Sequence, residues 1–236
     1  MATRRPTRAL RRAYELMFTA HGHQHWWPGD TPFEICVGAI LTQNTSWTNV
    51  EKAIANLKRA KVLSPGKMFE MPVAELAELI RPAGYYNLKA DRLRSFLEVL
   101  QEEHGGRMDR LFAGDTSEVR ERVLAIKGVG PETADSMLLY AGDHHRFVID
   151  GYTKRIFQRH NWWAGVGEQA KAKVNTKEEY ESLQKLCEDA LGQKSGEHEL
   201  DYWQDYHAQL VVIGKDFCKT RNPNCEECPL KPLLSR

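Results

Sequence analysis

Leu124–Met137 reads LAIKGVGPETADSM, which places Gly128 and Gly130 between two apolar segments. A helix, a Gly-Val-Gly turn and a second helix are typical of a helix-hairpin-helix, because glycine allows the positive φ and close backbone approach that the turn needs. The N–H groups that begin the second helix lack partners inside it and can hold a phosphate oxygen, with Lys127 adding positive charge. An ordinary helical hairpin would also explain these glycines, so other segments must decide between the two interpretations.

Helical periodicity extends over most of the chain on both sides of this turn. Apolar residues recur three and four positions apart, and Thr31 with Glu34, like Thr176 with Glu179, has the spacing of a capping box at a helix start. Strand-like alternation is not found in adjacent segments, and HHRFVID, residues 144–150, is too short to decide. We therefore predict an all-α protein of about ten helices.

The composition indicates a globular protein that does not cross a membrane. Of 236 residues, 42% are hydrophobic, yet no run of about 18 apolar residues occurs. No apolar stretch follows the N-terminal arginines, so we expect no secretory signal and a cytoplasmic location. The net charge is only +1, so DNA binding would need local basic clusters. The arginine-rich N-terminus is expected to be a solvated face, although it could touch phosphates: Arg4, Arg5, Arg8, Arg11 and Arg12.

Asp150 lies in FVIDGYTKRIF, residues 147–157, between a short apolar run and a predicted helix. A carboxylate at this point could face a cleft and act on a substrate. An aspartate before a helix is also the expected N-cap. The two roles are compatible, because a capped and buried carboxylate is held firmly.

Four blocks of the chain resemble the endonuclease III superfamily of DNA glycosylases in their order and spacing. The hairpin and the Asp150 segment form one block, and the others are FEICVGAILTQNTSWTNVEKA, IRPAGYYNLKADRL and CKTRNPNCEECPL. Together they cover nearly the whole chain from about Trp26 onward. The resemblance implies a DNA glycosylase that acts as a monomer on double-stranded DNA containing a damaged base, and that associates with the nucleoid.

The resemblance also implies a fold of two lobes with a DNA-binding cleft between them. We expect residues 30–141 to form a six-helix lobe that ends in the hairpin. Residues 1–29 and 142–236 would form the second helical lobe, which includes the C-terminal cysteine loop, and Asp150 would lie at the junction.

The residues in the matching blocks acquire roles from this family. Asp150 would stabilise the positive charge that develops on the deoxyribose as the base departs, or would help to activate water. Gln43 would fill the gap left by the extruded nucleotide, and Tyr85 would be the second wedge residue. The expected DNA contacts are Gln43, Tyr85, Asn87, Lys127, Gly128, Gly130 and Lys154.

Glu132 occupies the position at which bifunctional members of the family carry a lysine. That lysine attacks the sugar and forms a Schiff base, which permits strand cleavage. A carboxylate cannot form an imine, so we predict a monofunctional glycosylase without β-lyase activity.

Aromatic residues indicate which kind of damaged base the protein would remove. The expected base pocket comprises Trp26, Trp27, Pro28, Trp47, Lys215 and Glu132. This set resembles the branch of the superfamily that excises 3-methyladenine, and an electron-poor alkylated purine stacks well on aromatic faces. The tryptophans could instead be buried as part of the hydrophobic core. A glycosylase for an oxidised or mismatched base, or a non-catalytic helix-hairpin-helix DNA-binding protein, remains an alternative.

The C-terminal cysteines are metal-ligand candidates. Cys218, Cys225 and Cys228 match the first three cysteines of the family's iron–sulfur loop, whereas the fourth position is Leu234. The spacing favours a [4Fe–4S] cluster, with zinc as the lesser alternative. A fourth ligand could come from Cys187, His198 or His207, the cluster could bind weakly or with an exogenous ligand, or the loop could fold without metal. An odd, clustered set of five cysteines also argues against a disulfide scaffold.

Overall fold

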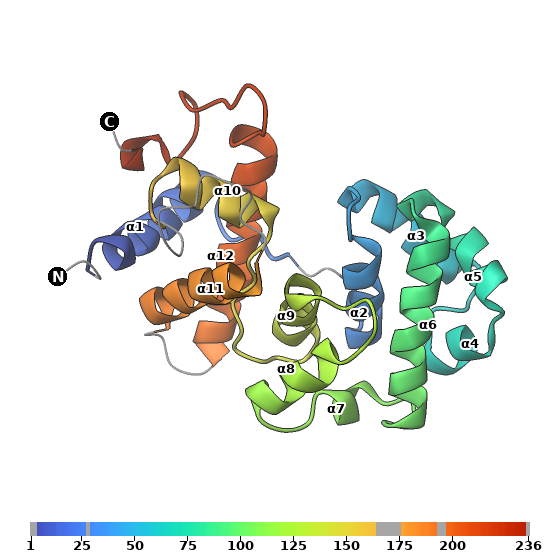
Figure 1. Ribbon diagram of the computed structural model, residues 1–236. Helices are drawn as coiled ribbons and strands as arrows, with labels where there is room; N and C mark the ends of the chain where they lie inside the picture. Colours follow the sequence, from blue (N-terminus) through green and yellow to red (C-terminus); the bar gives the residue numbers. More distant parts are fainter. Residues whose placement is uncertain (1–3, 27–28, 164–175, 193–196, 235–236) are drawn as a thin grey trace. The chain divides into compact units, whose positions relative to one another are not determined.

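The computed structural model describes residues 4–26, 29–163, 176–192 and 197–234, and within these ranges it contains helices and no strand (Figure 1). The prediction of an all-α protein is confirmed. Residues 144–150, undecided from the sequence, belong to no helix or strand, and Phe147, Val148 and Ile149 among them are buried. In the described ranges, no helix is both long and apolar enough to span a bilayer.

The chain divides into two compact units. One comprises Trp27–His144, and the other comprises Met1–Trp26 together with His145–Arg236. The sequence-based expectation places these boundaries at residues 30 and 141. Each unit has its own helices and its own core, and each is described by itself below.

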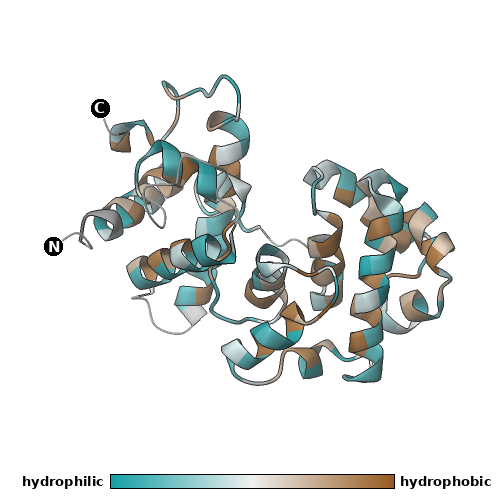
Figure 2. Cartoon of the chain, in the orientation of Figure 1, coloured by the Kyte–Doolittle hydropathy of each residue, from teal (hydrophilic) through white to brown (hydrophobic). Residues whose placement is uncertain are grey.

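The unit Trp27–His144 is built around a nearly fully buried helix, α2, that packs against the helix after the hairpin, α9. Eight of the ten residues of α2 are buried, and Figure 2 shows it as largely hydrophobic. The elements of this unit are α2 (Pro32–Leu41), α3 (Trp47–Arg59), α4 (Pro65–Glu70), α5 (Val73–Leu79), η1 (Arg81–Ala83), α6 (Tyr86–Glu102), α7 (Met108–Leu111), α8 (Thr116–Leu124) and α9 (Pro131–Ala141).

The two predicted capping boxes have different outcomes. At Thr176 the box forms completely, since the hydroxyl accepts from the Glu179 N–H and the Glu179 carboxylate accepts from the Thr176 N–H. At Thr31 only the first half forms, with the hydroxyl accepting from the Glu34 N–H at 3.2 Å. The Glu34 carboxylate instead pairs with Lys58 Nζ at 2.7 Å, because α3 brings a cation beside it.

The second unit packs α1 (Arg4–His21) against α11 (Lys177–Leu191), and α10 (Gly151–Arg159) against α12 (Glu197–Val212). The π-helix η2 (Ile213–Phe217) continues α12, and η3 (Lys231–Leu233) lies near the C-terminus. Tyr14 of α1 contacts the rings of Tyr202 and Tyr206 of α12, at centroid distances of 4.5 and 5.5 Å. This aromatic cluster fixes α1 on α12, the helix that supports Asp150.

Candidate functional site

Only one of the two glycines in the hairpin turn has the positive φ that the sequence predicts. Gly128 has a φ of +89°, whereas Gly130 is the N-cap of α9 with a φ of −97°. A Cβ at Gly128 would lie 2.4 Å from Arg92 Cγ, so this position requires glycine for space as well as for conformation. A Cβ at Gly130 would meet nothing within 4 Å. The start of α9 is therefore open to a ligand, and Lys127 beside it is exposed.

Gln43 is attached to the hairpin by its side chain. Its Nε2 donates to the carbonyl oxygen of Gly128 at 3.1 Å and to Thr133 Oγ1 at 3.0 Å. Arg92 of α6 donates from Nη1 to Gln43 Oε1 on the other side of the amide. The predicted wedge residue and the predicted phosphate-binding turn are thus parts of one hydrogen-bonded cluster.

The second predicted wedge lies in a left-handed turn before α6. Gly84 and Tyr85 have φ values of +68° and +46°, and 71% of Tyr85 is exposed. Leu88, in the first turn of α6, is 48% exposed, and Asn87 between Tyr85 and Leu88 is exposed as well. This loop therefore presents an aromatic and an apolar side chain to solvent.

Asp150 is the N-cap of α10 and is 8% exposed. Its Oδ1 accepts from the Thr153 N–H at 2.7 Å, and its Oδ2 lies 3.6 Å from His207 Nε2 of α12. Burial raises the pKa of Asp150, but the His207 imidazole and the Thr153 hydrogen bond outweigh burial, so the pKa lies below its usual value. The carboxylate is consequently ionised at neutral pH and held in one orientation.

Trp26 lies beside His207. The two ring centroids are 5.8 Å apart, and His207 in turn lies beside Asp150, so one histidine neighbours both a predicted pocket residue and the predicted catalytic carboxylate. The segment before Trp26 is fixed by Asp205, which accepts from the Gln24 N–H at 2.7 Å and from Tyr14 Oη at 2.8 Å. Trp27 and Pro28, also predicted for the pocket, lie outside the described residues.

The remaining predicted pocket and DNA-contact residues lie at separate places. Trp47, the first residue of α3, is partly buried against the core of the unit Trp27–His144. Glu132 is exposed in the first turn of α9, and Lys215 is exposed on η2. Lys154 Nζ lies 5.7 Å from the centroid of the Tyr180 ring. The roles of these residues in base or DNA binding remain predictions.

The three C-terminal cysteines line one hollow together with His160, Arg159, Phe217 and Leu234. None of the proposed fourth ligands lines it: Cys187 is in the core, His198 is exposed on α12, and His207 lies beside Asp150. Among the described residues, no three Cys, His, Asp or Glu side chains are grouped closely enough to hold a metal ion. The donors present do not fit a four-cysteine cluster.

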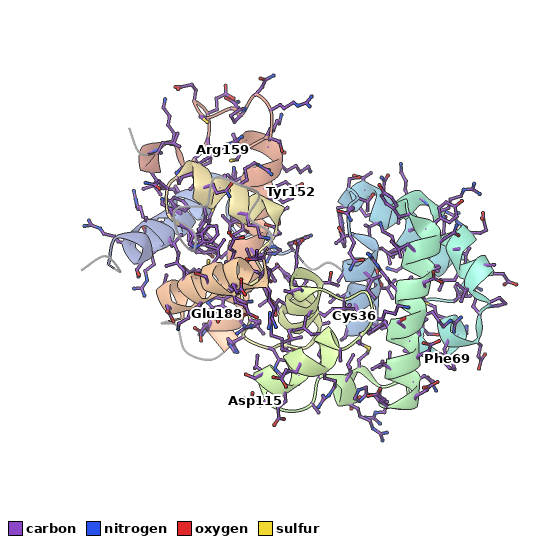
Figure 3. The ribbon with its side chains drawn as sticks, in the orientation of Figure 1. Cys36, Phe69, Asp115, Tyr152, Arg159 and Glu188 are labelled. Atoms are coloured by element: carbon purple, nitrogen blue, oxygen red, sulfur yellow. The ribbon has the colours of Figure 1, made fainter. Side chains whose placement is uncertain are left out.

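Arginines of α10 hold the cysteine loop by its main chain. Arg155 donates to the carbonyl oxygens of Cys218, at 2.6 Å, and Gly214, at 2.9 Å. Arg159, labelled in Figure 3, lies 3.1 Å from Cys218 Sγ and also donates to the Thr220 carbonyl at 3.3 Å. The loop is therefore docked on the helix that Asp150 begins by contacts that involve no metal.

The sequence patterns do not single out Lys89, Arg92 or Thr133, and they suggest His207 only as a metal ligand, not as the neighbour of Asp150. Arg92 and Gln43 are 49 positions apart, so no local pattern connects them. Lys89 is 1% exposed, and its position on the inner face of α6 was the only available signal. The helical spacing of buried positions in 86–102 could have marked it as a buried cation that needs partners.

Comparison with known proteins agrees with a helix-hairpin-helix DNA-repair fold. The HhH-GPD superfamily, described as base excision DNA repair proteins, matches residues 37–188. The chain is 42% identical over 219 residues to a proposed DNA repair glycosylase of Methanocaldococcus jannaschii, and 92% of each chain is covered. It is 29% identical over 201 residues to endonuclease III of Thermotoga maritima, with 85% of this chain and 81% of that protein covered. This protein belongs to the HhH-GPD superfamily.

Solved structures show the same fold. A 3-methyladenine DNA glycosylase of H. pylori, bound to 1,N6-ethenoadenine, has 26% identity and a TM-score of 0.71, covering 89% of this chain and 97% of that one. Endonuclease III in a non-covalent DNA complex has 20% identity and a TM-score of 0.74, covering 97% and 94%, which is a likeness of fold. The predicted resemblance to the endonuclease III superfamily is confirmed.

Proposed function

We propose that this protein is a monofunctional DNA glycosylase that releases an alkylated purine, such as 3-methyladenine, from duplex DNA. The observation that carries the proposal is Asp150, a buried, ionised carboxylate fixed by Thr153 and His207 in a member of a base excision repair superfamily. The protein would act as a monomer at a single damaged base.

Asp150 supplies the electrostatic part of the reaction. As the N-glycosidic bond breaks, the sugar develops the positive charge of an oxocarbenium-like state, which a fixed carboxylate stabilises. The Thr153 N–H and the His207 ring hold Asp150 ready, so no reorganisation is needed as the charge appears. The same carboxylate can orient the water that attacks the sugar carbon after the base has left.

Trp26 supports an alkylated base as the substrate. A methylated purine is electron-poor and stacks well on an indole, and its glycosidic bond is already weakened, so little acid catalysis is required. Trp26 lies beside His207, the residue that contacts Asp150. Likeness to the 3-methyladenine DNA glycosylase of H. pylori supports the same substrate class.

Gln43 and Tyr85 would replace the extruded nucleotide. Flipping a base out of the stack costs a few kcal/mol, which side chains inserted in its place can offset. Tyr85 is mostly exposed, and Gln43 is bonded to the turn that would hold the backbone phosphate. Gly128, Gly130 and Lys127 would form that phosphate-binding turn.

Glu132 supports hydrolysis without strand cleavage. It is exposed at the start of α9, where a lyase of this family would present an amine, and its carboxylate cannot attack the sugar to form an imine. The product would then be an abasic site in an intact strand.

A [4Fe–4S] cluster on Cys218, Cys225 and Cys228 remains part of the proposal in a restricted form. The three thiols line one hollow, but a full set would need a fourth donor, and no three Cys, His, Asp or Glu side chains of the described residues are grouped closely enough to hold a metal ion. Such a cluster would have a structural role, and Arg155 and Arg159 connect the loop to α10 without it. Iron, zinc and acid-labile sulfide analysis of the purified protein, with its visible absorbance, distinguishes cluster, zinc and metal-free loop.

The decisive test of substrate class is a panel of duplexes, each carrying one lesion, with free base measured after incubation. We expect release of 3-methyladenine and little release of oxidised pyrimidines or mismatched bases. Preferential release of an oxidised or mismatched base would replace the substrate assignment. Tight duplex binding with no released base from any lesion would instead identify a non-catalytic DNA-binding protein.

A further inference from the structure

Lys89 is a lysine inside the core of the unit Trp27–His144. It is 1% exposed, although lysine is among the residues least often fully buried. Its Nζ donates to the carbonyl oxygen of Leu41 at 2.8 Å and to that of Ala83 at 2.7 Å. Within the described part of the chain both of its hydrogen bonds end on the main chain, and no ion pair with a carboxylate is found there.

The two carbonyls are at the ends of elements that lead into the two wedge loops. Leu41 is the last residue of α2, two positions before Gln43, and Ala83 is the last residue of η1, two positions before Tyr85. Carbonyls at helix ends lack partners within the helix and carry partial negative charge, so an ammonium group is a favourable partner for both. One cation therefore fixes the starting points of both loops.

A buried ammonium group is retained here at a cost in free energy. Burial, with the nearby Arg92 cation, lowers the pKa of Lys89 to about 8, which shows that the site disfavours the charge. An apolar side chain would fill this core position without that penalty. Compared with an apolar residue, a lysine at this position adds the two hydrogen bonds to the carbonyls at which the two loops begin.

We propose that Lys89 is a positioning residue that holds the Gln43 loop and the Tyr85 loop at a fixed separation, so that both side chains enter the duplex together. The inference rests on the proposed wedge function of Gln43 and Tyr85. Arg92, three residues further along α6, completes the arrangement by holding the Gln43 amide against the hairpin. Two residues of α6 thereby support both wedge loops.

The test uses Lys89→Met, whose unbranched side chain ends one atom earlier and makes neither hydrogen bond. Binding is measured by fluorescence anisotropy on a duplex with one tetrahydrofuran abasic analogue, so base release is not required. We expect an affinity about tenfold lower than wild type on this duplex and unchanged on the single strand, where no gap is filled. Lys52→Met, at an exposed lysine of α3, is the matched control for loss of one charge.

A double-mutant cycle separates positioning from general stability. If Lys89 acts through the wedge loops, Lys89→Met adds no loss of affinity in the Gln43→Ala/Tyr85→Ala background. Additive losses, or equal losses on duplex and single strand, would overturn the inference. If Lys89→Met melts below the assay temperature, Lys89→Gln, which keeps a donor, takes its place in the same cycle. A wild-type protein that binds the abasic duplex but releases no base would refute the enzyme proposal and leave this test intact.

Discussion

The Gln43 side chain donates a hydrogen bond to the Gly128 carbonyl, 3.1 Å away and 85 positions later in the chain. This bond joins the loop after α2 to the hairpin turn before α9. Arg92 and Thr133 hold the same amide from two other elements. The residue expected to enter DNA is therefore preorganised by the turn expected to hold phosphate.

Gly128→Ala tests the hairpin geometry. Because φ is +89° and a Cβ would lie 2.4 Å from Arg92 Cγ, we expect a loss of about 2 kcal/mol in the free energy of unfolding. Gly130→Ala is the matched control, since its φ is −97° and its Cβ would meet nothing within 4 Å. Urea unfolding should show a change within about 0.5 kcal/mol for the control. Equal destabilisation by both substitutions would contradict the described turn.

Arg92→Met and Thr133→Val test the preorganisation of Gln43. Each removes one partner of the Gln43 amide, and a net hydrogen bond is worth about 1 kcal/mol, so Thr133→Val should weaken binding to a damaged duplex about fivefold. Arg92→Met should weaken it more, because a charged donor is lost. Titrations on damaged and intact duplexes provide the measurement. Unchanged affinity in both variants would mean that this hydrogen-bonded cluster does not prepare Gln43 for DNA.

Local sequence patterns predicted most of the fold. Contacts between residues far apart in the sequence could not be predicted from those patterns. Periodicity and caps indicated the helices, but the Thr31 box is only half formed because Lys58 from α3 takes the Glu34 carboxylate. Motifs indicated Asp150, Gln43 and the glycines. Lys89 and Leu41 lie 48 positions apart, so their contact exists only once the helices have packed.

His207 is a second residue whose role depends on contacts that the sequence pattern does not contain. Its residue type suggested a metal ligand, but α12 directs it to Asp150 and Trp26 instead of to the cysteines. The side of a helix on which a histidine functions depends on which neighbours pack there. That information is absent from spacing alone.

The stability of the protein should depend on pH through Asp150. Its pKa in the folded state is lower than the unfolded value of 3.8, so the ionised carboxylate stabilises the fold above that value. This contribution is lost as pH falls through the folded-state pKa. The difference in unfolding free energy between wild type and Asp150→Asn should shrink as pH falls from about pH 5 toward pH 3. A difference that grows over this interval would contradict the assigned direction.

Borohydride trapping tests the interpretation of Glu132. A Schiff base would be reduced to a stable protein–DNA adduct, and no adduct is expected from the wild-type protein because a carboxylate cannot form an imine. Glu132→Lys places an amine at the same point in the first turn of α9, and we expect it to give a detectable adduct. Efficient trapping by wild type would show that another amine attacks the sugar.

Single-turnover release of 3-methyladenine by wild type and Asp150→Asn tests the central claim most directly. Asparagine keeps the size of the side chain and removes the charge that would stabilise the oxocarbenium-like state, so base release should fall by about 100-fold or more. Binding to the tetrahydrofuran duplex should remain within a few fold of wild type. Base release at the wild-type rate by Asp150→Asn would contradict the account.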